Sequence, residues 1–151
     1  MIKVFIGLIN LSLIFSQFNW QEGGLPLRQG VHIEWMRTSS VDPEGNLIVV
    51  WSDTRHGIRD IYAKKIDENG NDLWNTEGVL VIGAEGRQED PIMVSDDSGG
   101  AYIIWQDYRD EAEDGDIYAQ HLDSNGNLLW NSDGVPLSNQ VGVQKYHNLP
   151  Y

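Results

Sequence analysis

Residues 105–130, WQDYRDEAEDGDIYAQHLDSNGNLLW, repeat the pattern of residues 51–74, WSDTRHGIRDIYAKKIDENGNDLW. The opening W-x-D-x-R element recurs 54 residues later, and the D-I-Y-A element of residues 60–63 recurs 56 residues later because two residues are inserted between them. The match continues through Gly70/Gly126, Leu73/Leu129, Trp74/Trp130, Asn75/Asn131, Gly78/Gly134 and Gln88/Gln144. An internal repeat of this period predicts a fold built from similar stacked units.

Within each unit the sequence indicates β-strands. Residues 47–51 (LIVVW) and 101–105 (AYIIW) are apolar, rich in β-branched and aromatic side chains, and follow the turn signals DPEGN and DDSGG. Such runs predict strands covered on both faces. Residues 60–67 and 116–123 end in the turns DENGN and DSNGN, in which Asn-Gly predicts a hairpin with a type I′ turn. No 12-residue window after residue 16 keeps a helical apolar stripe, so we predict an all-β fold.

Each unit is expected to contain four short strands. In the second unit they are predicted near 91–95, 100–106, 116–122 and 127–130, the last followed by GVPLS. A four-stranded antiparallel meander that recurs every 40–55 residues is typical of a β-propeller blade. We expect the bulky residues 103–105, and their counterparts 49–51, to fill the spaces between blades.

The repeat register predicts about two blades, at approximately 37–90 and 91–146, with partial flanking blades. Trp20, Gly24 and Leu25 align with Trp74, Gly78 and Val79, and Gln144 aligns with Gln88. Closed propellers need about four to eight blades. The expected partners are therefore further propeller blades, supplied either by a missing part of the chain or by other copies of it.

The first 16 residues have the layout of a secretory signal peptide. Lys3 precedes an apolar run at 4–15, and the small residue Ser16 follows it. The run is shorter than the roughly 20 residues needed to span a bilayer. We expect cleavage after Ser16, a mature chain of residues 17–151 that is secreted or held at the cell surface, and no membrane insertion of that mature chain. A buried N-terminal helix or strand is the alternative.

Composition narrows the classes of ligand. The 151 residues carry 10 Lys and Arg against 23 Asp and Glu, a net charge of -13, which disfavours nucleic acid and anionic membranes as partners. There is no cysteine, so disulfides, thiolate metal sites and cysteine nucleophiles are excluded. The sequence has no G-x-S-x-G elbow and no Gly-rich phosphate loop, and its histidines lack metal-ligand spacing. We predict no cofactor.

These motifs resemble a tandem propeller repeat of large secreted bacterial proteins, in which W-x-D-x-R and D-I-Y-A-x-x-x-D-x-x-G-x-x-L-W recur. Many of those proteins look like surface or exported factors of the type IX secretion kind. The turns at 67–74 and 123–130 are also similar to the Asp-box of sialidase-like propellers, although they lack its leading Ser and Thr and differ in spacing. The resemblance implies a propeller fold and an extracellular location, and it does not indicate a ligand.

The repeated polar residues are interpreted as structural. Asp53 and Arg55 lie two positions apart and point to one face, where Asp60 on the next strand is placed to pair with the arginine. A residue that occurs in every unit is better explained by construction of the unit than by catalysis. The alternative is that Arg55 and Arg109 line a channel and bind anions. The residues assigned to the repeat are Trp51, Asp53, Arg55, Asp60, Tyr62, Asp67, Gly70, Trp74, Trp105, Asp107, Arg109, Asp116, Tyr118, Asp123, Gly126 and Trp130.

Three further groups of residues are candidates for binding or structural roles. In the turns, Asp67 and Asp123 are expected to accept backbone N–H bonds. The acidic insertion is the better calcium candidate because hard cations prefer clustered carboxylates, but a solvated loop is favoured and no metal site is predicted. Its carboxylates are Asp110, Glu111, Glu113, Asp114 and Asp116. Trp35, with Tyr108 and Tyr146, is placed to stack on a sugar if exposed, although packing is favoured.

We therefore predict a non-catalytic β-propeller repeat module of an exported bacterial protein, with a structural, adhesive or ligand-binding role toward protein or glycan. The alternative is a fragment of a sialidase-like propeller glycoside hydrolase whose catalytic residues lie outside this chain. An enzyme should carry acidic and aromatic residues that break the repeat. Trp35 and the 110–116 insertion are the clear breaks here, which favours the binding module.

Overall fold

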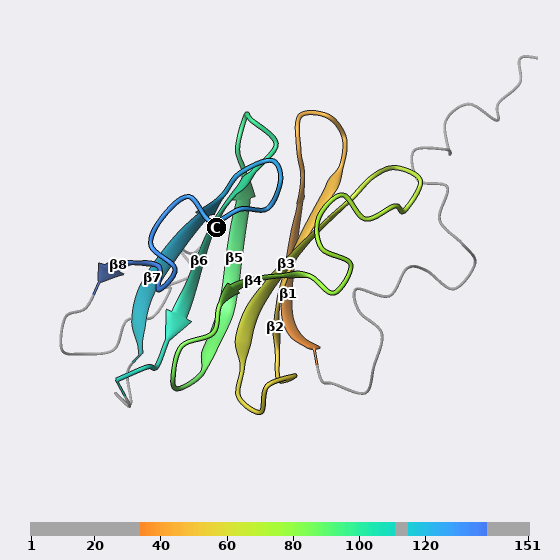
Figure 1. The fold of residues 1–151 in the computed structure, drawn as a ribbon. Helices are drawn as coiled ribbons and strands as arrows, with labels where there is room; N and C mark the ends of the chain where they lie inside the picture. Colours follow the sequence, from red (N-terminus) through yellow and green to blue (C-terminus); the bar gives the residue numbers. More distant parts are fainter. Residues whose placement is uncertain (1–33, 111–114, 139–151) are drawn as a thin grey trace, which may run out of the picture.

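The computed structural model describes residues 34–110 and 115–138, which form two four-stranded antiparallel sheets without a helix (Figure 1). The first sheet contains β1 (Glu34–Val41), β2 (Leu47–Asp53), β3 (Asp60–Ile66) and β4 (Val79–Ile82). The second contains β5 (Gln88–Ser95), β6 (Ala101–Asp107), β7 (Asp116–Leu122) and β8 (Val135–Ser138). Each is a meander of consecutive strands. The all-β prediction is confirmed, and across these residues the sheets do not close into a ring.

The two sheets share their pairing register. Trp51 lies opposite Tyr62 in the β2–β3 pair, and Trp105 lies opposite Tyr118 in the β6–β7 pair. The first and last pairs of each sheet contain an irregularity at corresponding places. In β5 the irregularity includes Asp90, which has a φ of 53°. Such bulges bend a strand and re-aim its side chains.

The core lies between the sheets. In Figure 1 the sheets stand side by side, and β5 lies against β1, β2 and β3. Ile48 and Val50 of β2 share one cluster with Ile103 and Trp105 of β6, and all four are fully buried. Because neighbouring side chains on a strand point to opposite faces, Trp51 belongs to a separate cluster on the other face of the first sheet.

The hairpin turns differ from the predicted type I′ geometry. The hairpin at 67–71 is present, with Ile66 bridging to Asp72 and the Gly70 amide donating to the Asp67 carbonyl at 3.0 Å. Gly70 has a φ of 84°, whereas Asn69 is not in the left-handed region that a type I′ turn requires. The turn is a type I turn followed by a left-handed glycine, held by the Asp67 carboxylate, and the type I′ prediction is wrong.

The fourth strand of the second sheet is not at 127–130. That segment makes only an isolated bridge between Leu122 and Leu128, and the strand that pairs with β7 is Val135–Ser138. Between them the chain turns at 131–134. Gly134 has a φ of 75°, and a Cβ there would lie 2.7 Å from the Trp105 ring. The glycine lets the chain pass close to the indole, and the fourth strand begins directly after it, in the GVPLS segment.

Candidate functional site

A cluster of an aspartate, an arginine and a tyrosine stands at the end of β2. The Asp53 carboxylate is fully buried and accepts bonds from Trp51 Nε1 at 3.3 Å and from the Arg55 backbone N at 2.7 Å. The Arg55 guanidinium bonds the same carboxylate at 3.0 and 2.5 Å and lies 3.6 Å from the centre of the Tyr62 ring. It also donates to the Glu77 carbonyl at 2.7 Å. Arg55 thus ties β2 to the turn before β4.

The end of β6 carries the same arrangement. Asp107 accepts bonds from Trp105 Nε1 at 2.8 Å and from the Arg109 guanidinium at 2.9 and 2.6 Å. Arg109 lies 3.9 Å from the centre of the Tyr118 ring and donates to the Asp133 carbonyl at 2.9 Å. Both clusters consist of side chains that the sequence analysis assigned to the repeat.

These clusters hold their charges in fixed pairs. Burial raises the pKa of Asp53, but the bonds from Arg55 and Trp51 outweigh it and leave that pKa below its usual value. The hydrogen bond to Asp107 raises the pKa of Arg109. The arginine pairs with the aspartate two residues before it, and not with Asp60 on the next strand as expected. Asp60 lies opposite Asp53 in the register, and burial raises its pKa. An aspartate kept ionised against an arginine is suited to holding a loop and not to proton transfer.

The turn aspartates accept bonds from their own turns. Asp67 Oδ1 accepts the backbone N–H groups of Asn69 and Asn71 at 2.9 and 2.8 Å, and Oδ2 accepts Asn71 Nδ2 at 2.8 Å. Asp123 makes the corresponding bonds to Asn125 and Asn127. The side-chain bond from the asparagine four residues on is the main cause that lowers the pKa of each carboxyl. Turn closure is the role expected for them.

Most of the calcium candidate lies outside the described residues. Asp110 and Asp116 are described, whereas Glu111, Glu113 and Asp114 are not. In residues 34–110 and 115–138, no group of three His, Asp or Glu side chains is placed to hold a metal ion. Residues 1–16, for which a signal peptide is predicted, also lie outside the described part, as do Trp20, Gln144, Tyr146 and the side chain of Trp35. Tyr108 is described and stacks under Arg87, whose guanidinium lies 3.7 Å from the ring centre.

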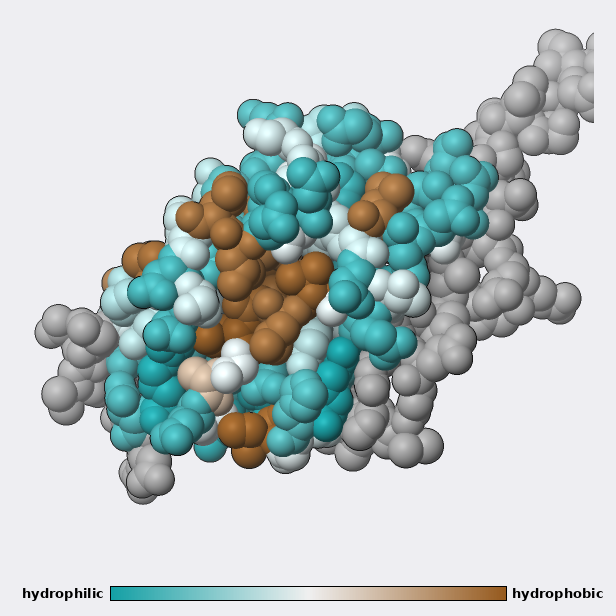
Figure 2. Space-filling view, in the orientation of Figure 1, coloured by the Kyte–Doolittle hydropathy of each residue, from teal (hydrophilic) through white to brown (hydrophobic). Residues whose placement is uncertain are grey.

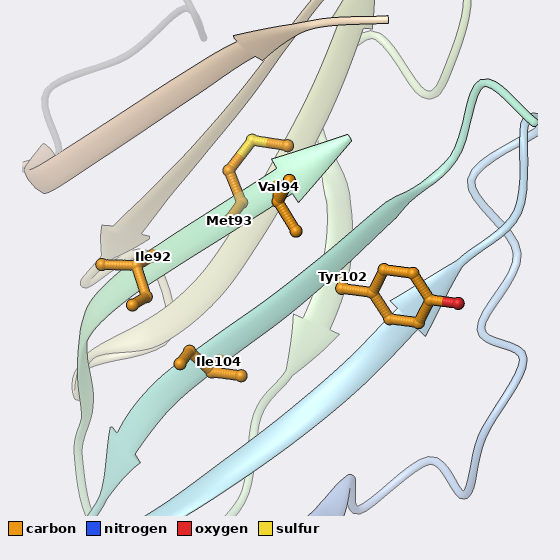
Figure 3. Close-up of a pocket in the computed structure, with 5 residues that line it drawn as sticks. All are labelled: Ile92, Met93, Val94, Tyr102 and Ile104. Carbon is orange, nitrogen blue, oxygen red and sulfur yellow. The ribbon is translucent and has the colours of Figure 1, made fainter. Parts of the chain in front are cut away.

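Sequence reasoning missed an apolar hollow on the outer face of the second sheet. It has a volume of about 170 Å³ and is lined by residues of β5 and β6, namely Ile92, Met93, Val94, Tyr102 and Ile104 (Figure 3). Of these, Met93 also packs against the core between the sheets. Val94 is 58% exposed, Ile92 45% and Tyr102 42%. Apolar side chains also gather in the middle of the molecular face seen in Figure 2, surrounded by hydrophilic ones. The signal was available in the alternation of β6, where Tyr102 and Ile104 face away from Ile103.

An aromatic group extends the hollow toward β7. The Tyr102 and His121 rings stack with centroids 3.9 Å apart, and Trp130 lies 5.9 Å from both. His121 Nε2 is 2.6 Å from Asp96 Oδ2. Trp130 is 38% exposed. The outer face therefore combines branched aliphatic side chains with three rings.

Specific polar contacts join the two sheets. Trp74 is 6% exposed and donates from Nε1 to the Ser124 carbonyl at 2.9 Å, across the DSNGN turn of the second sheet. Lys65 Nζ pairs with Asp42 Oδ2 at 2.5 Å and donates to the Gly99 carbonyl at 2.8 Å. These contacts fix how the second sheet sits on the first.

No protein family, curated protein or solved structure matches the chain. Along residues 34–110 and 115–138 we find no helix with the length and apolar character to cross a membrane.

Proposed function

We propose that the chain is a non-catalytic β-propeller repeat module of an exported bacterial protein, in which each four-stranded sheet is one blade. Its role is structural or adhesive, and it offers its surfaces to protein or glycan ligands. The resemblance of W-x-D-x-R and D-I-Y-A to the repeats of large secreted bacterial proteins supports the location.

The observation that carries the proposal is the duplicated Asp–Arg–Tyr cluster. Arg55 pairs with Asp53, donates to a backbone carbonyl and lies over a tyrosine ring. Arg109 makes the same three contacts, with Asp107 as its ion-pair partner. A catalytic site needs a unique constellation with groups free to meet a substrate. Groups that are paired in the same way in both sheets support a role in building the blade.

The way the sheets stack supports the blade assignment. The face of the first sheet that carries Ile48 and Val50 meets the face of the second that carries Ile103 and Trp105. In the repeat alignment these are not the same face, because Val50 corresponds to Ile104 and Trp51 to Trp105. Opposite faces of the repeat unit thus meet where the two sheets stack, as they do between successive blades of a propeller. In a sandwich with two-fold symmetry the same face of each unit would meet its copy.

The experiment is a paired assay of the full chain for turnover and for binding. We expect no hydrolysis of a panel of fluorogenic glycosides, sialosides included, above the buffer rate, and we expect binding on a glycan array or to a surface protein. Arg55→Lys and Arg109→Lys serve as matched variants that keep the charge and lose the bidentate pairing. Hydrolysis that Asp53→Asn or Asp107→Asn abolishes would refute the non-catalytic proposal.

A further inference from the structure

We infer that the outer face of the second sheet is a docking surface for one further four-stranded sheet of the same kind as β5–β8. The inference rests on the proposed function and names the partner of one surface. The surface is formed by the hollow of β5 and β6 (Figure 3) together with the stacked Tyr102 and His121 rings and the nearby Trp130 ring.

The first sheet shows what covers this face. Tyr102 and Ile104 occupy the positions of Ile48 and Val50, 54 residues earlier. Ile48 and Val50 are fully buried because the second sheet lies on them, whereas Tyr102 is 42% exposed. The corresponding face is therefore covered in one sheet and open in the other.

The polar contacts repeat the asymmetry. Trp74 is buried because its indole N–H reaches the Ser124 carbonyl in the turn of the next sheet, and a Cβ at Gly126 would lie 3.0 Å from its ring. Trp130 is the counterpart of Trp74, and it is 38% exposed. A docked sheet with an Asp-x-x-Gly turn would offer Trp130 a backbone carbonyl to accept its indole N–H. The glycine of that turn would leave room for the Trp130 ring, as Gly126 does for Trp74.

His121 marks a second contact point. Its counterpart Lys65 pairs with Asp42 and donates to the Gly99 carbonyl of the next sheet. His121 makes the pair with Asp96 in the same way. The docked sheet would present the glycine of its own hairpin here, as the second sheet presents Gly99 to Lys65 and Asp42 of the first.

A second copy of the chain does not expose, among its described residues, the face that would dock on this surface. The face needed is one with an isoleucine and a tryptophan at alternate positions, as Ile103 and Trp105 provide. That face is buried against the first sheet, and the corresponding face of the first sheet is buried too, with Trp51 at 0% and Val49 at 8% exposure. The occupant is therefore an additional sheet and not a second copy of this one.

The test duplicates residues 88–143 in place, so that every native residue is kept and one unit is inserted with the chain's own 56-residue spacing. The natural chain has no cysteine, so Val94→Cys places a single thiol on the surface, at a residue that is 58% exposed. We expect a charged thiol reagent to label it rapidly in the natural chain. In the duplicated chain labelling should be slower by about tenfold or more, because it then requires local opening of the sheet contact.

Two matched thiols serve as controls. The same substitution in the added copy lies on the new outer face and should react as fast as in the natural chain. Ile58→Cys, in the loop after β2 where Ile58 is 47% exposed, should react equally in both chains. Circular dichroism and the melting transition report whether the inserted unit folds.

Equal labelling of Val94→Cys in the natural and duplicated chains would overturn the inference. So would a concentration-dependent dimer of the natural chain that protects this thiol, because a second copy would then be the occupant. Neither result depends on turnover or ligand binding, so failure of the docking surface is distinguishable from failure of the proposed function.

Discussion

The two sheets have the same strand order and register, yet corresponding side chains differ in burial. Ile48 is fully buried and its counterpart Tyr102 is 42% exposed, while Trp74 is 6% and Trp130 is 38% exposed. Trp51 and Trp105, in contrast, are fully buried in both sheets. The difference teaches that the face carrying Ile48 in the first sheet and Tyr102 in the second is buried only where a further sheet lies on it. Trp51, by contrast, is buried on the face of the first sheet that the second sheet does not cover. Substitutions at paired positions can separate the two contributions.

The largest effect should come from β6, whose two faces meet different surroundings. Trp105→Ala removes a fully buried indole between the sheets and should lower the free energy of unfolding by about 4 kcal/mol. Tyr102→Ala, on the open face of the same strand, should cost about 1 kcal/mol because the ring is already partly hydrated. Urea unfolding followed by far-ultraviolet circular dichroism measures both. Equal losses would mean that the two faces of β6 are equally covered in solution.

The next effect comes from the lysine that joins the sheets. Burial raises the pKa of Asp42, but the bonds from Lys65 and Asn46 outweigh it and leave that pKa lowered. Lys65→Met leaves the buried Asp42 carboxylate without its counter-ion and should cost about 3 kcal/mol. His121→Met, at the corresponding position on the partly exposed face, should cost about 1 kcal/mol or less. If His121→Met lowered the free energy of unfolding as much as Lys65→Met, the ion pair between His121 and Asp96 would be shielded from solvent in the natural chain.

The tryptophan pair after the hairpins gives a smaller difference. Trp74→Ala removes packing over Gly126 and the bond to the Ser124 carbonyl of the other sheet, whereas Trp130→Ala removes a ring that packs near Tyr102 and His121 of its own sheet and is 38% exposed. We expect Trp74→Ala to be more destabilising by about 2 kcal/mol. Urea unfolding of the two variants under one set of conditions checks this. In the chain with residues 88–143 duplicated, Trp130→Ala should approach the cost of Trp74→Ala.

Alternation and turn signals were enough to predict the all-β fold and most strands. Residues 47–51 and 101–105 lie in β2 and β6 because β-branched runs between glycine turns have few other structures open to them. The fourth strand was misplaced because Leu128 and Trp130 look like a strand, although the space that Gly134 leaves beside Trp105 sets where pairing resumes.

The candidate site was harder to predict from sequence. Spacing placed Asp53 and Arg55 on one face, but it did not show that the arginine turns back to Asp53, because that depends on the Tyr62 ring and the Glu77 carbonyl. The open face of the second sheet was missed for a similar reason. A sequence repeat treats Ile48 and Tyr102 as equivalent, whereas their exposure depends on what is packed against them.

The smallest expected effect concerns the two aspartates that face each other across β2 and β3. Burial raises the pKa of Asp60, with a further contribution from the Asp53 charge, while His56 and Arg55 lower it. Because the folded pKa is raised, ionisation of Asp60 costs stability as the pH rises from the ordinary value of 3.8 through the folded pKa. Asp60→Asn removes that cost. The variant should be slightly more stable than the natural chain at neutral pH, and the gain should vanish as the pH falls to about 3.8.

Asp53→Asn should behave in the opposite way. The folded pKa of Asp53 is lowered, so its carboxylate contributes stability above its ordinary pKa, and this contribution is lost as the pH falls through the folded pKa. Thermal unfolding of the natural chain and both variants between pH 3 and 8 gives the two curves. If Asp60→Asn lowered stability at neutral pH, the ionised Asp60 would be part of the Asp–Arg–Tyr cluster after all. The pairing expected from sequence between Arg55 and the next strand would then have a role in solution.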